Sequence, residues 1–433
     1  MFFVERANAM RIVGLEEGAR TARLFRHIGD GAGKRCPSAK VPRPVFNFDW
    51  RSTMNIKSLL LGSAAALVAV SGAQAADAVV YEPEPVEYVR VCDAYGAGFY
   101  YIPGTETCLS ISGYVWMQVG GHGRNNAVTD APSYHYGFAL NNGYNVLTRG
   151  RLNIDARSDT EWGTLRSYLR LQGTWGTNAD GNVTFDQAFL ELGGLRIGYT
   201  ESAWAQTQNG GASNWGSHSW TGMYYGYQQR HLIAYTFSGN GFAATLSLEH
   251  DDDGAIGTAG AAAAADWVPD VVGKVSYNAG WGAVWAKIGY DSDMSLLAGR
   301  QDEWSASVGM QYNIPNMNGS NLRLIGYYAS GDNSYGVARL GGGFGAAEWS
   351  ILASYNHVFT STFSASLAFQ YNNDHYFAAT NINTGVDTWA TELSMVWTPV
   401  QNFEVRSELA YQDVDVAGVS GTFSGFIRFT RYF

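Results

Sequence analysis

The sequence predicts an all-β protein, a sixteen-stranded antiparallel transmembrane β-barrel with short periplasmic turns and long external loops. Segments of about nine to thirteen residues alternate apolar and polar side chains, which is the period of a strand with two different faces. Short turns and long connections alternate between these segments, as in barrels that cross a membrane. After residue 75, no apolar run approaches the roughly 20 residues that a membrane-spanning helix needs.

The segment at 148–158 shows the alternation most clearly. Its even positions carry Gly, Leu, Ile and Ala, whereas its odd positions carry Arg149, Arg151, Asn153, Asp155 and Arg157. Segment 182–193 alternates less cleanly, for which a β-bulge would account. The predicted strands are 109–120, 145–158, 164–174, 182–193, 195–204, 230–237, 242–250, 270–278, 283–291, 302–313, 321–330, 347–357, 363–373, 387–398, 403–413 and 422–433.

The connections between these strands fall into two classes. The short ones carry turn residues, such as Gly-Gly at 193–194, Ser-Gly-Asn-Gly at 238–241 and Ala-Gly-Trp-Gly at 279–282. The longer ones are 121–144, 205–229, 251–269, 331–346 and 374–386. This regular alternation predicts that all the short turns lie at one end of the barrel and all the long loops at the other.

A soluble β-sandwich would also show strands with two faces, but it would bury its apolar face against a second sheet. Here the apolar face is rich in aromatic residues near the segment ends, where membrane barrels carry an interfacial girdle. The other face carries Arg, Glu and Gln, which suits a water-filled lumen. An even number of strands also lets the barrel close without a free edge.

Residues 54–75 have the organisation of a secretory signal peptide. Lys57 provides the basic start, an apolar run follows, and Ala73-Gln74-Ala75 forms the cleavage site. Residues 1–53 are rich in Arg and show no strand or helix period. We interpret 1–53 as an over-extended gene start, the alternative being a disordered cytoplasmic leader. The predicted domains are this extension (1–53), the signal peptide (54–75), an N-terminal segment with a disulfide (76–108) and the barrel (109–433).

The charge of the exported part argues against a nucleic-acid partner. Residues 1–75 hold 11 of the 28 Lys and Arg and 5 of the 38 Asp and Glu, which leaves 17 and 33 and a net charge of −16. Binding to phosphates needs clustered Lys and Arg. After residue 75 the sequence has two lysines, Lys274 and Lys287, and its other cationic residues are arginines.

Cys92 and Cys108 are a pair in a chain that carries an export signal, because Cys36 lies in the leader. A single pair in an oxidising compartment favours a disulfide. Two free thiols are the alternative, and a metal site would need further ligands nearby.

The two ends of the exported sequence carry a family resemblance. "YEPEPVEYVRVCDAYGAGFYYIPGTETCLSISGYVWMQ" (81–118) resembles the start of mature alphaproteobacterial outer-membrane general porins of the rhizobial type, and "GFIRFTRYF" (425–433) is similar to their last strand. The terminal Phe433 resembles the signal read by the barrel-assembly machinery. Arg431 stands where the family more often has an aromatic residue.

The resemblance implies a passive water-filled channel for small hydrophilic solutes and ions. It implies a homotrimer in the bacterial outer membrane, in contact with lipid and lipopolysaccharide. It also implies that the third external loop, 205–229 here, folds into the lumen as a constriction. Constriction loops in the family commonly carry acidic residues, whereas this loop has no Asp or Glu. The nearest carboxylates are Asp186, Glu191 and Glu201.

Six arginines are the predicted pore-lining and selectivity residues. They lie on the polar faces of the strands that precede the loop, where they can form a basic ladder: Arg149, Arg151, Arg157, Arg166, Arg170 and Arg196. In the alternative interpretation they pair with carboxylates and only brace the wall. The acidic remainder of the chain favours cations, so we expect weak cation selectivity.

Two other function classes remain as alternatives. An outer-membrane barrel enzyme, such as a lipase or protease, would need a catalytic cluster, and the sequence has neither G-x-S-x-G nor H-E-x-x-H. A structural or adhesin barrel would have a plugged lumen. Among the eight histidines, His218 and His231 are near the expected constriction. No catalytic residue, cofactor or metal site is predicted.

The signal peptide leads to a prediction about the mature N-terminus. Cleavage after Ala75 makes Ala76 the first residue of the exported protein. N-terminal sequencing of protein purified from outer membranes will give Ala-Asp-Ala-Val. Peptides from residues 1–53 in the same fraction would show that the extension is retained.

Overall fold

A computed structural model describes residues 90–122, 143–176, 179–206, 216–220, 223–251, 267–292, 302–317, 319–340, 343–378, 380–417 and 421–433. All of them belong to one compact unit, Pro85–Phe433. The predicted extension, the signal peptide and its cleavage site lie outside the described residues.

Strands make up nearly all of the regular structure. They are β1 (Phe99–Tyr101), β2 (Cys108–His122), β3 (Gly143–Thr160), β4 (Gly163–Gly176), β5 (Ala179–Leu192), β6 (Leu195–Glu201), β7 (Gln229–Gly239), β8 (Phe242–Glu249), β9 (Asp270–Ala279), β10 (Gly282–Asp291), β11 (Glu303–Asn313), β12 (Asn321–Ala329), β13 (Phe344–Thr360), β14 (Phe363–Phe377), β15 (Ile382–Asn383), β16 (Thr388–Val400), β17 (Phe403–Val414) and β18 (Thr422–Tyr432). Among the described residues, one 3₁₀ turn, η2, covers Asp93–Tyr95. In the described ranges, no helix is both long enough and apolar enough to cross a membrane.

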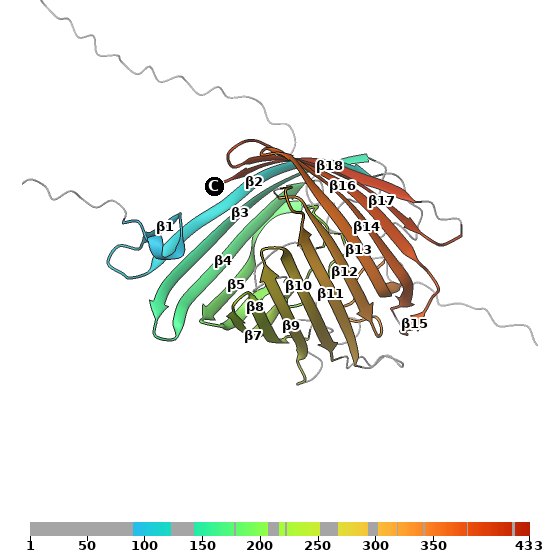
Figure 1. Ribbon diagram of the computed structural model, residues 1–433, viewed down its shortest axis with the longest axis horizontal. Helices are drawn as coiled ribbons and strands as arrows, with labels where there is room; N and C mark the ends of the chain where they lie inside the picture. Colours follow the sequence, from blue (N-terminus) through green and yellow to red (C-terminus); the bar gives the residue numbers. More distant parts are fainter. Residues whose placement is uncertain are drawn as a thin grey trace, which may run out of the picture. The chain divides into compact units, whose positions relative to one another are not determined.

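The sixteen longer strands form one closed antiparallel ring (Figure 1). Each pairs with the next along the chain, and β18 closes the ring by pairing with β2. The remaining two strands are short additions, β1 against the start of β2 and β15 against the end of β14. A closed ring has no unpaired edge, which is the condition for a sheet to cross a bilayer.

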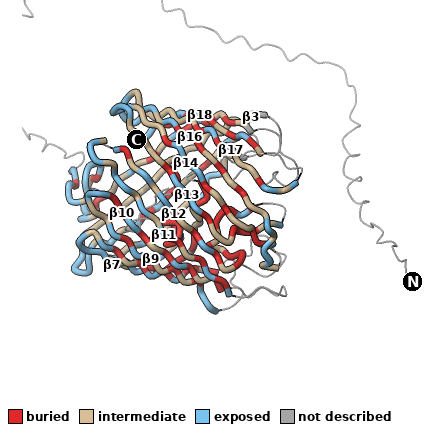
Figure 2. Tube along the Cα trace, turned by 45° about the vertical axis from the view of Figure 1, so that its right-hand side comes forward, coloured by how far each residue is buried: buried red, intermediate tan, exposed pale blue. Residues whose placement is uncertain are grey.

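Burial alternates along the strands, as the change of colour along the tube in Figure 2 shows. In β9, Lys274 and Ser276 are buried, whereas their neighbours Val275 and Tyr277 are exposed. The exposed positions of the ring are apolar and the buried positions are largely polar, which is the reverse of a soluble sheet. The apolar outer face therefore suits lipid, and the polar face lines the lumen.

Aromatic residues stand on the outer face near both ends of the strands. Tyr235 and Phe237 near the end of β7 and Trp397 near the end of β16 are exposed beside short turns. Trp304 and Phe423 are exposed at the opposite end, where β11 and β18 begin. Amphipathic rings at these two levels are the expected interfacial girdles.

Tight turns join the strands at one end. Between β7 and β8, Asn240 and Gly241 both have positive φ values, 52° and 80°. Two successive left-handed residues are what a two-residue hairpin turn with the right twist needs, and Asn-Gly adopts them with little strain. A Cβ at Gly241 would also lie 2.3 Å from the carbonyl oxygen of Asn278.

The C-terminal residue is part of the seam that closes the ring. Gly113 N donates to Phe433 O at 3.0 Å, and Phe433 N donates to Gly113 O at 3.1 Å. A Cβ at Gly113 would meet the carbonyl oxygen of Arg151 at 2.1 Å, so only glycine lets the backbones approach here. Phe433 is thus paired through its backbone to the first long strand.

The structure confirms all sixteen predicted strands, with ends that differ by a few residues. The predicted strand 195–204 is too long, because β6 ends at Glu201 and the next residues turn inward. The irregular segment at 182–193 contains the expected bulge: the pairing of β4 with β5 shifts between Arg170 and Leu171 and again between Gly173 and Trp175. The short strands β1 and β15 were not predicted, since two or three residues carry too little pattern.

The predicted disulfide joins Cys92 to Cys108, whose Cα atoms lie 5.9 Å apart. Cys108 is the first residue of β2, so the bond attaches the N-terminal segment to the ring. Both sulfur-bearing side chains are buried with Phe99, and Tyr95 and Tyr101 pack against them. This small cluster is separate from the interior of the barrel.

The position of the disulfide predicts a local effect when it is removed. A loop of this length restricts the unfolded chain by about 3 kcal/mol. Cys92→Ser will make the segment before β2 sensitive to protease, while the thermal unfolding of the barrel changes little because sixteen paired strands are untouched. Circular dichroism and limited proteolysis measure the two effects. Loss of the folded barrel in the variant would contradict a purely local staple.

Candidate functional site

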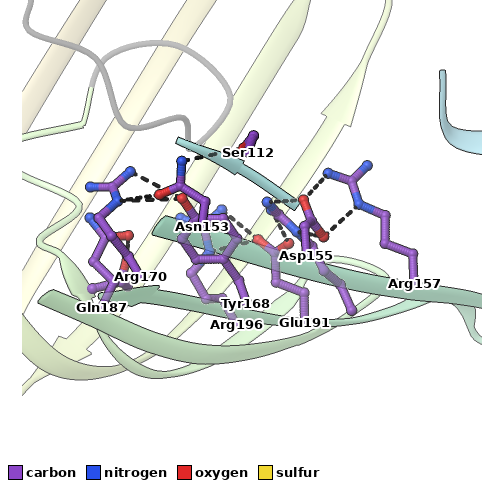
Figure 3. Close-up of polar contacts among 11 residues, drawn as sticks. Ser112, Asn153, Asp155, Arg157, Tyr168, Arg170, Gln187, Glu191 and Arg196 are labelled. Carbon is purple, nitrogen blue, oxygen red and sulfur yellow. Dashed lines mark hydrogen bonds and ion pairs between the residues drawn. The ribbon is translucent and has the colours of Figure 1, made fainter. Parts of the chain in front are cut away.

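The six predicted arginines lie on the inward faces of three strands: β3, β4 and β6. Acidic and polar residues of the same strands and of β5 stand between them, and Figure 3 shows the labelled side chains on one side of the sheet. We call this set of arginines, with Asp155, Asp186 and Glu191, the arginine wall. Its contacts decide how much positive charge faces the lumen.

Asp155 binds two arginines at once. Its carboxylate accepts from Arg157 Nε at 3.0 Å and Nη2 at 2.7 Å, and from Arg166 Nε at 3.0 Å and Nη2 at 2.9 Å. Each guanidinium therefore makes a two-point contact with the same carboxylate, the strongest geometry that the two groups can form. This arrangement holds Arg157 and Arg166 flat against the wall.

Glu191 continues the network along β5. It accepts from Arg166 Nη1 at 2.8 Å and from Arg196 Nε at 2.7 Å. Asp186, at the bulge, lies 3.4 Å from Arg170 and 3.6 Å from Arg151. The three carboxylates thus cross-link arginines of three strands.

Arg149 is held differently. Its Nε donates to Thr174 Oγ1 at 2.8 Å, and its guanidinium lies 5.1 Å from the ring centre of Trp116. Within the described residues, it forms no ion pair. Five arginines share three carboxylates and the sixth has none, so the described part of this wall keeps an excess of positive charge.

The contacts of these arginines bear on the bracing interpretation, whereas their role in lining the pore stays a prediction. Five of the six arginines are paired with carboxylates, as the bracing interpretation expects. Their side chains nevertheless keep part of their surface open, from 11% for Arg170 to 27% for Arg157. The ion pairs fix the positions of the charges without removing them from the lumen, so bracing and lining are compatible.

The described residues that follow β6 turn into the barrel, whereas the role of 205–229 as a constriction stays a prediction. Ala203, Trp204 and Ala205 are buried. Ala203 N donates to Glu249 Oε1 at 2.9 Å, and Lys287 Nζ donates to Trp204 O at 2.6 Å. These contacts reach inward-facing side chains of β8 and β10, so the chain enters the lumen at this point.

The later part of this segment crosses to the far wall. Gln370 of β14 holds both backbone groups of Tyr224: Tyr224 N donates to Oε1 at 2.9 Å, and Nε2 donates to Tyr224 O at 3.0 Å. Trp220 N donates to Glu408 Oε1 of β17 at 2.6 Å. Arg428 of β18 stacks on Trp220, 3.7 Å from the ring centre. We call the described residues of this segment, 203–206, 216–220 and 223–228, the inward loop.

His218 also anchors the inward loop. Its Nδ1 lies 2.6 Å from Ser354 Oγ and its Nε2 lies 2.5 Å from Asn321 Oδ1. Burial, aided by the nearby Arg323, lowers the pKa of His218 to about 3, so the imidazole is neutral at physiological pH. His231, the other histidine singled out, is exposed on the outer face of β7 and stacks on Tyr199.

The anchors of the inward loop were not found by sequence reasoning. The strand residues that hold the loop occupy inward positions, so the alternation along each strand is enough to indicate a lumen-facing side chain. These residues are Gln370, Glu408, Ser354 and Arg428. Their partners lie far away in the sequence, 188 residues in the case of Trp220 and Glu408, and no local pattern encodes such a contact.

Residues 77–426 match the family described as the porin subfamily. Porin Omp2b of Brucella suis is 34% identical over 416 residues, which cover 88% of this chain and all of the relative. Porin Omp2b of Brucella abortus gives the same identity and coverage. The chain belongs to the porin family. This porin is therefore a β-barrel protein of the bacterial outer membrane.

Solved structures agree with the fold of the porin. The outer membrane channel DcaP of Acinetobacter baumannii is similar with a TM-score of 0.60 at 14% identity, covering 77% of this chain and 99% of that one. The anion-selective porin from Comamonas acidovorans has a TM-score of 0.52 at 15% identity, covering 76% of this chain and all of that one. At these identities the likeness shows the fold alone.

The contacts of Gln370 predict how to loosen the inward loop. Gln370→Ala removes three buried hydrogen bonds, two to Tyr224 and one to Ser350 Oγ, each of which contributes about 1 kcal/mol. Chymotrypsin will then cleave the folded porin after Tyr224 or Tyr225 several-fold faster, as followed by gel and mass spectrometry.

Asn372→Ala is the matched control for this experiment. Asn372 is a buried inward amide on the same strand, and its side chain donates to Thr388 rather than to the loop. Cleavage at the wild-type rate in Asn372→Ala and Gln370→Ala alike would show that Gln370 does not hold the loop.

Proposed function

We propose that this porin is a general-diffusion channel whose passage runs between the inward loop and the arginine wall. The proposal rests on the observation that the inward loop is bound to one part of the lumen wall, whereas the arginines occupy another part. The described part of the inward loop binds side chains of β8, β10, β12, β13, β14, β16 and β17. The arginines of β3 and β4 bind carboxylates of β3 and β5 and keep part of their surface open.

The charges of the arginine wall suit the sorting of ions. Guanidinium groups stay protonated at any physiological pH. Held beside a narrow passage with low-dielectric walls, they act on a passing ion more strongly than they would in open water. The acidic remainder of the chain, with its net charge of −16 after residue 75, gathers cations at the mouths. The proposed outcome is weak net cation selectivity with a locally basic wall.

Catalysis is the competing function, and one contact suggests it at first sight. Ser354, His218 and Asn321 lie in a row that resembles a nucleophile, a base and an orienting amide. Ser354 Oγ also accepts the backbone N–H of His218, and a histidine whose pKa is lowered to about 3 is a poor base at neutral pH. We therefore assign this row to anchoring the inward loop and propose a porin without enzymatic activity.

The proposed partners follow from the outer face and the seam. The apolar band contacts outer-membrane lipid and lipopolysaccharide, and a homotrimer is the proposed assembly. Phe433, paired through its backbone with Gly113, is the proposed terminus that the barrel-assembly machinery reads. Small hydrophilic solutes and ions are the cargo.

Conductance in planar bilayers tests the channel and the role of the arginines. The wild-type porin will form stable open channels in potassium chloride. Arg166→Glu with Arg170→Glu reverses two charges and removes one of the two arginine partners of each of Asp155, Asp186 and Glu191. The reversal potential in a salt gradient will therefore move strongly toward cations, by at least several-fold in the permeability ratio.

Glu191→Gln is the control with the opposite sign, because it removes one carboxylate from the same network and will move the reversal potential toward anions. Heat-modifiable migration on gels checks that each variant is folded. A folded double variant with the wild-type reversal potential would show that these arginines do not line the passage, and a porin that conducts no ions would refute the channel.

A further inference from the structure

The two lysines that follow residue 75 are neighbours in the barrel. Lys274 of β9 and Lys287 of β10 are directly paired in the register of these antiparallel strands, and both side chains point inward. Their exposed fractions are 2% and 8%. Like charges directly opposite on paired strands repel each other, so two buried ammonium groups here need a source of negative charge.

The described residues supply little of that charge. Lys287 Nζ donates to Trp204 O of the inward loop at 2.6 Å. Lys274 Nζ has no hydrogen-bond partner among the described residues, although an ammonium group can donate three bonds. A buried charge that lacks partners is costly. An anion bound to the Lys274 ammonium group would lower that cost.

Glu249, the carboxylate that acts on Lys274, already accepts other hydrogen bonds. Glu249 acts electrostatically on Lys274, but its Oε1 accepts from Ala203 N at 2.9 Å and its Oε2 from Tyr335 OH at 3.3 Å. Arg196 also acts on Lys274 and adds a further positive charge. Local repulsion between cations is therefore only partly offset.

Inward-facing hydroxyl groups on the same and neighbouring strands also lack hydrogen-bond partners among the described residues. Ser307 of β11 is the register partner of Lys287, and Ser276 lies on the same face of β9 as Lys274, two residues further along. Both hydroxyls, like that of Ser247 on β8, are buried and lack a hydrogen-bond partner within the described part of the chain. Four adjacent strands, β8 to β11, thus present hydrogen-bond donors on one inner face.

A cavity lies beside this group and reaches the neighbouring strand β8. It has a volume of about 340 Å³, and its lining includes Arg196, Glu191, Gln206 of the inward loop, Thr245 and the turn residues Gly193 and Gly194. Thr245 is the register partner of Lys274. The cavity therefore runs from the periplasmic turn between β5 and β6 to within one strand of Lys274.

We propose that Lys274 and Lys287, with Ser276 and Ser307, form a binding site for a small oxyanion on the lumen wall. Its ligand is a phosphate, sulfate or carboxylate group, whose several oxygen atoms can accept from ammonium and hydroxyl donors together. The inference rests on the proposed channel function and adds a class of solute to it. Chloride lacks the separated acceptor oxygens that this set of donors favours.

Inorganic phosphate is the probe for the site. In planar bilayers at constant ionic strength, added phosphate will reduce the chloride-carried current along a saturable curve. Lys274→Met keeps the length of the side chain without its charge and will raise the half-effective phosphate concentration at least tenfold. Ser307→Ala keeps every charge and will raise it several-fold, which attraction by net charge alone does not explain.

Two controls separate the site from general effects. Arg90→Gln removes one positive charge from the exposed N-terminal segment and will leave the phosphate curve as in the wild type. Acetate and sulfate test the other oxyanions. In detergent, phosphate will raise the thermal unfolding temperature of the wild-type porin and not that of Lys274→Met, a readout that does not need conductance.

The outcomes distinguish the site from the channel. A porin that conducts potassium chloride but shows neither a saturable phosphate effect nor a thermal shift would overturn the oxyanion site and leave the channel standing. A porin that does not conduct would overturn the channel, and the thermal shift would still decide whether the lysines bind phosphate.

Discussion

The hydrogen bonds between β18 and β2 are the constraint on which the rest of the structure depends. Inside a bilayer, no water satisfies backbone groups, so a sheet must close on itself. Closure also decides where each side chain points, because every second residue of every strand faces the same enclosed space. A polar lumen follows from this geometry. The arginine wall, the inward loop and the lysine pair are different ways of using the space that closure creates.

The inward loop shows how the interior of a barrel differs from the core of a soluble domain. Its backbone leaves the sheet and must find other partners, which amide, carboxylate and hydroxyl side chains of the strands provide. Strands on one side are thereby used to hold the loop. On the other side, charged side chains of β3 to β6 form ion pairs with one another. The two halves of the lumen wall differ in function because their side chains differ in partners.

The strands could be predicted because alternation is a local property, legible in a run such as 148–158. The inward position of the six arginines followed from the same parity. Their partners could not be predicted, since Arg166 binds Glu191 across a strand pair whose register shifts at the bulge. The infolding of the loop came from family resemblance, because contacts such as that between Trp220 and Glu408 have no local signature. The pairing of Lys274 with Lys287 likewise needed the register.

The seam has a kinetic consequence. Gln118 and Arg428, which meet across it, are 310 residues apart in the chain. Contacts this distant form late, since the entropy of closing so long a segment must be overcome before any of them stabilises the fold. Until β18 arrives, β2 has an open edge that can pair with another molecule. The open edge of β2 must therefore be protected while the chain crosses the periplasm, and the pairing of the eleven residues of β18 ends the need for that protection.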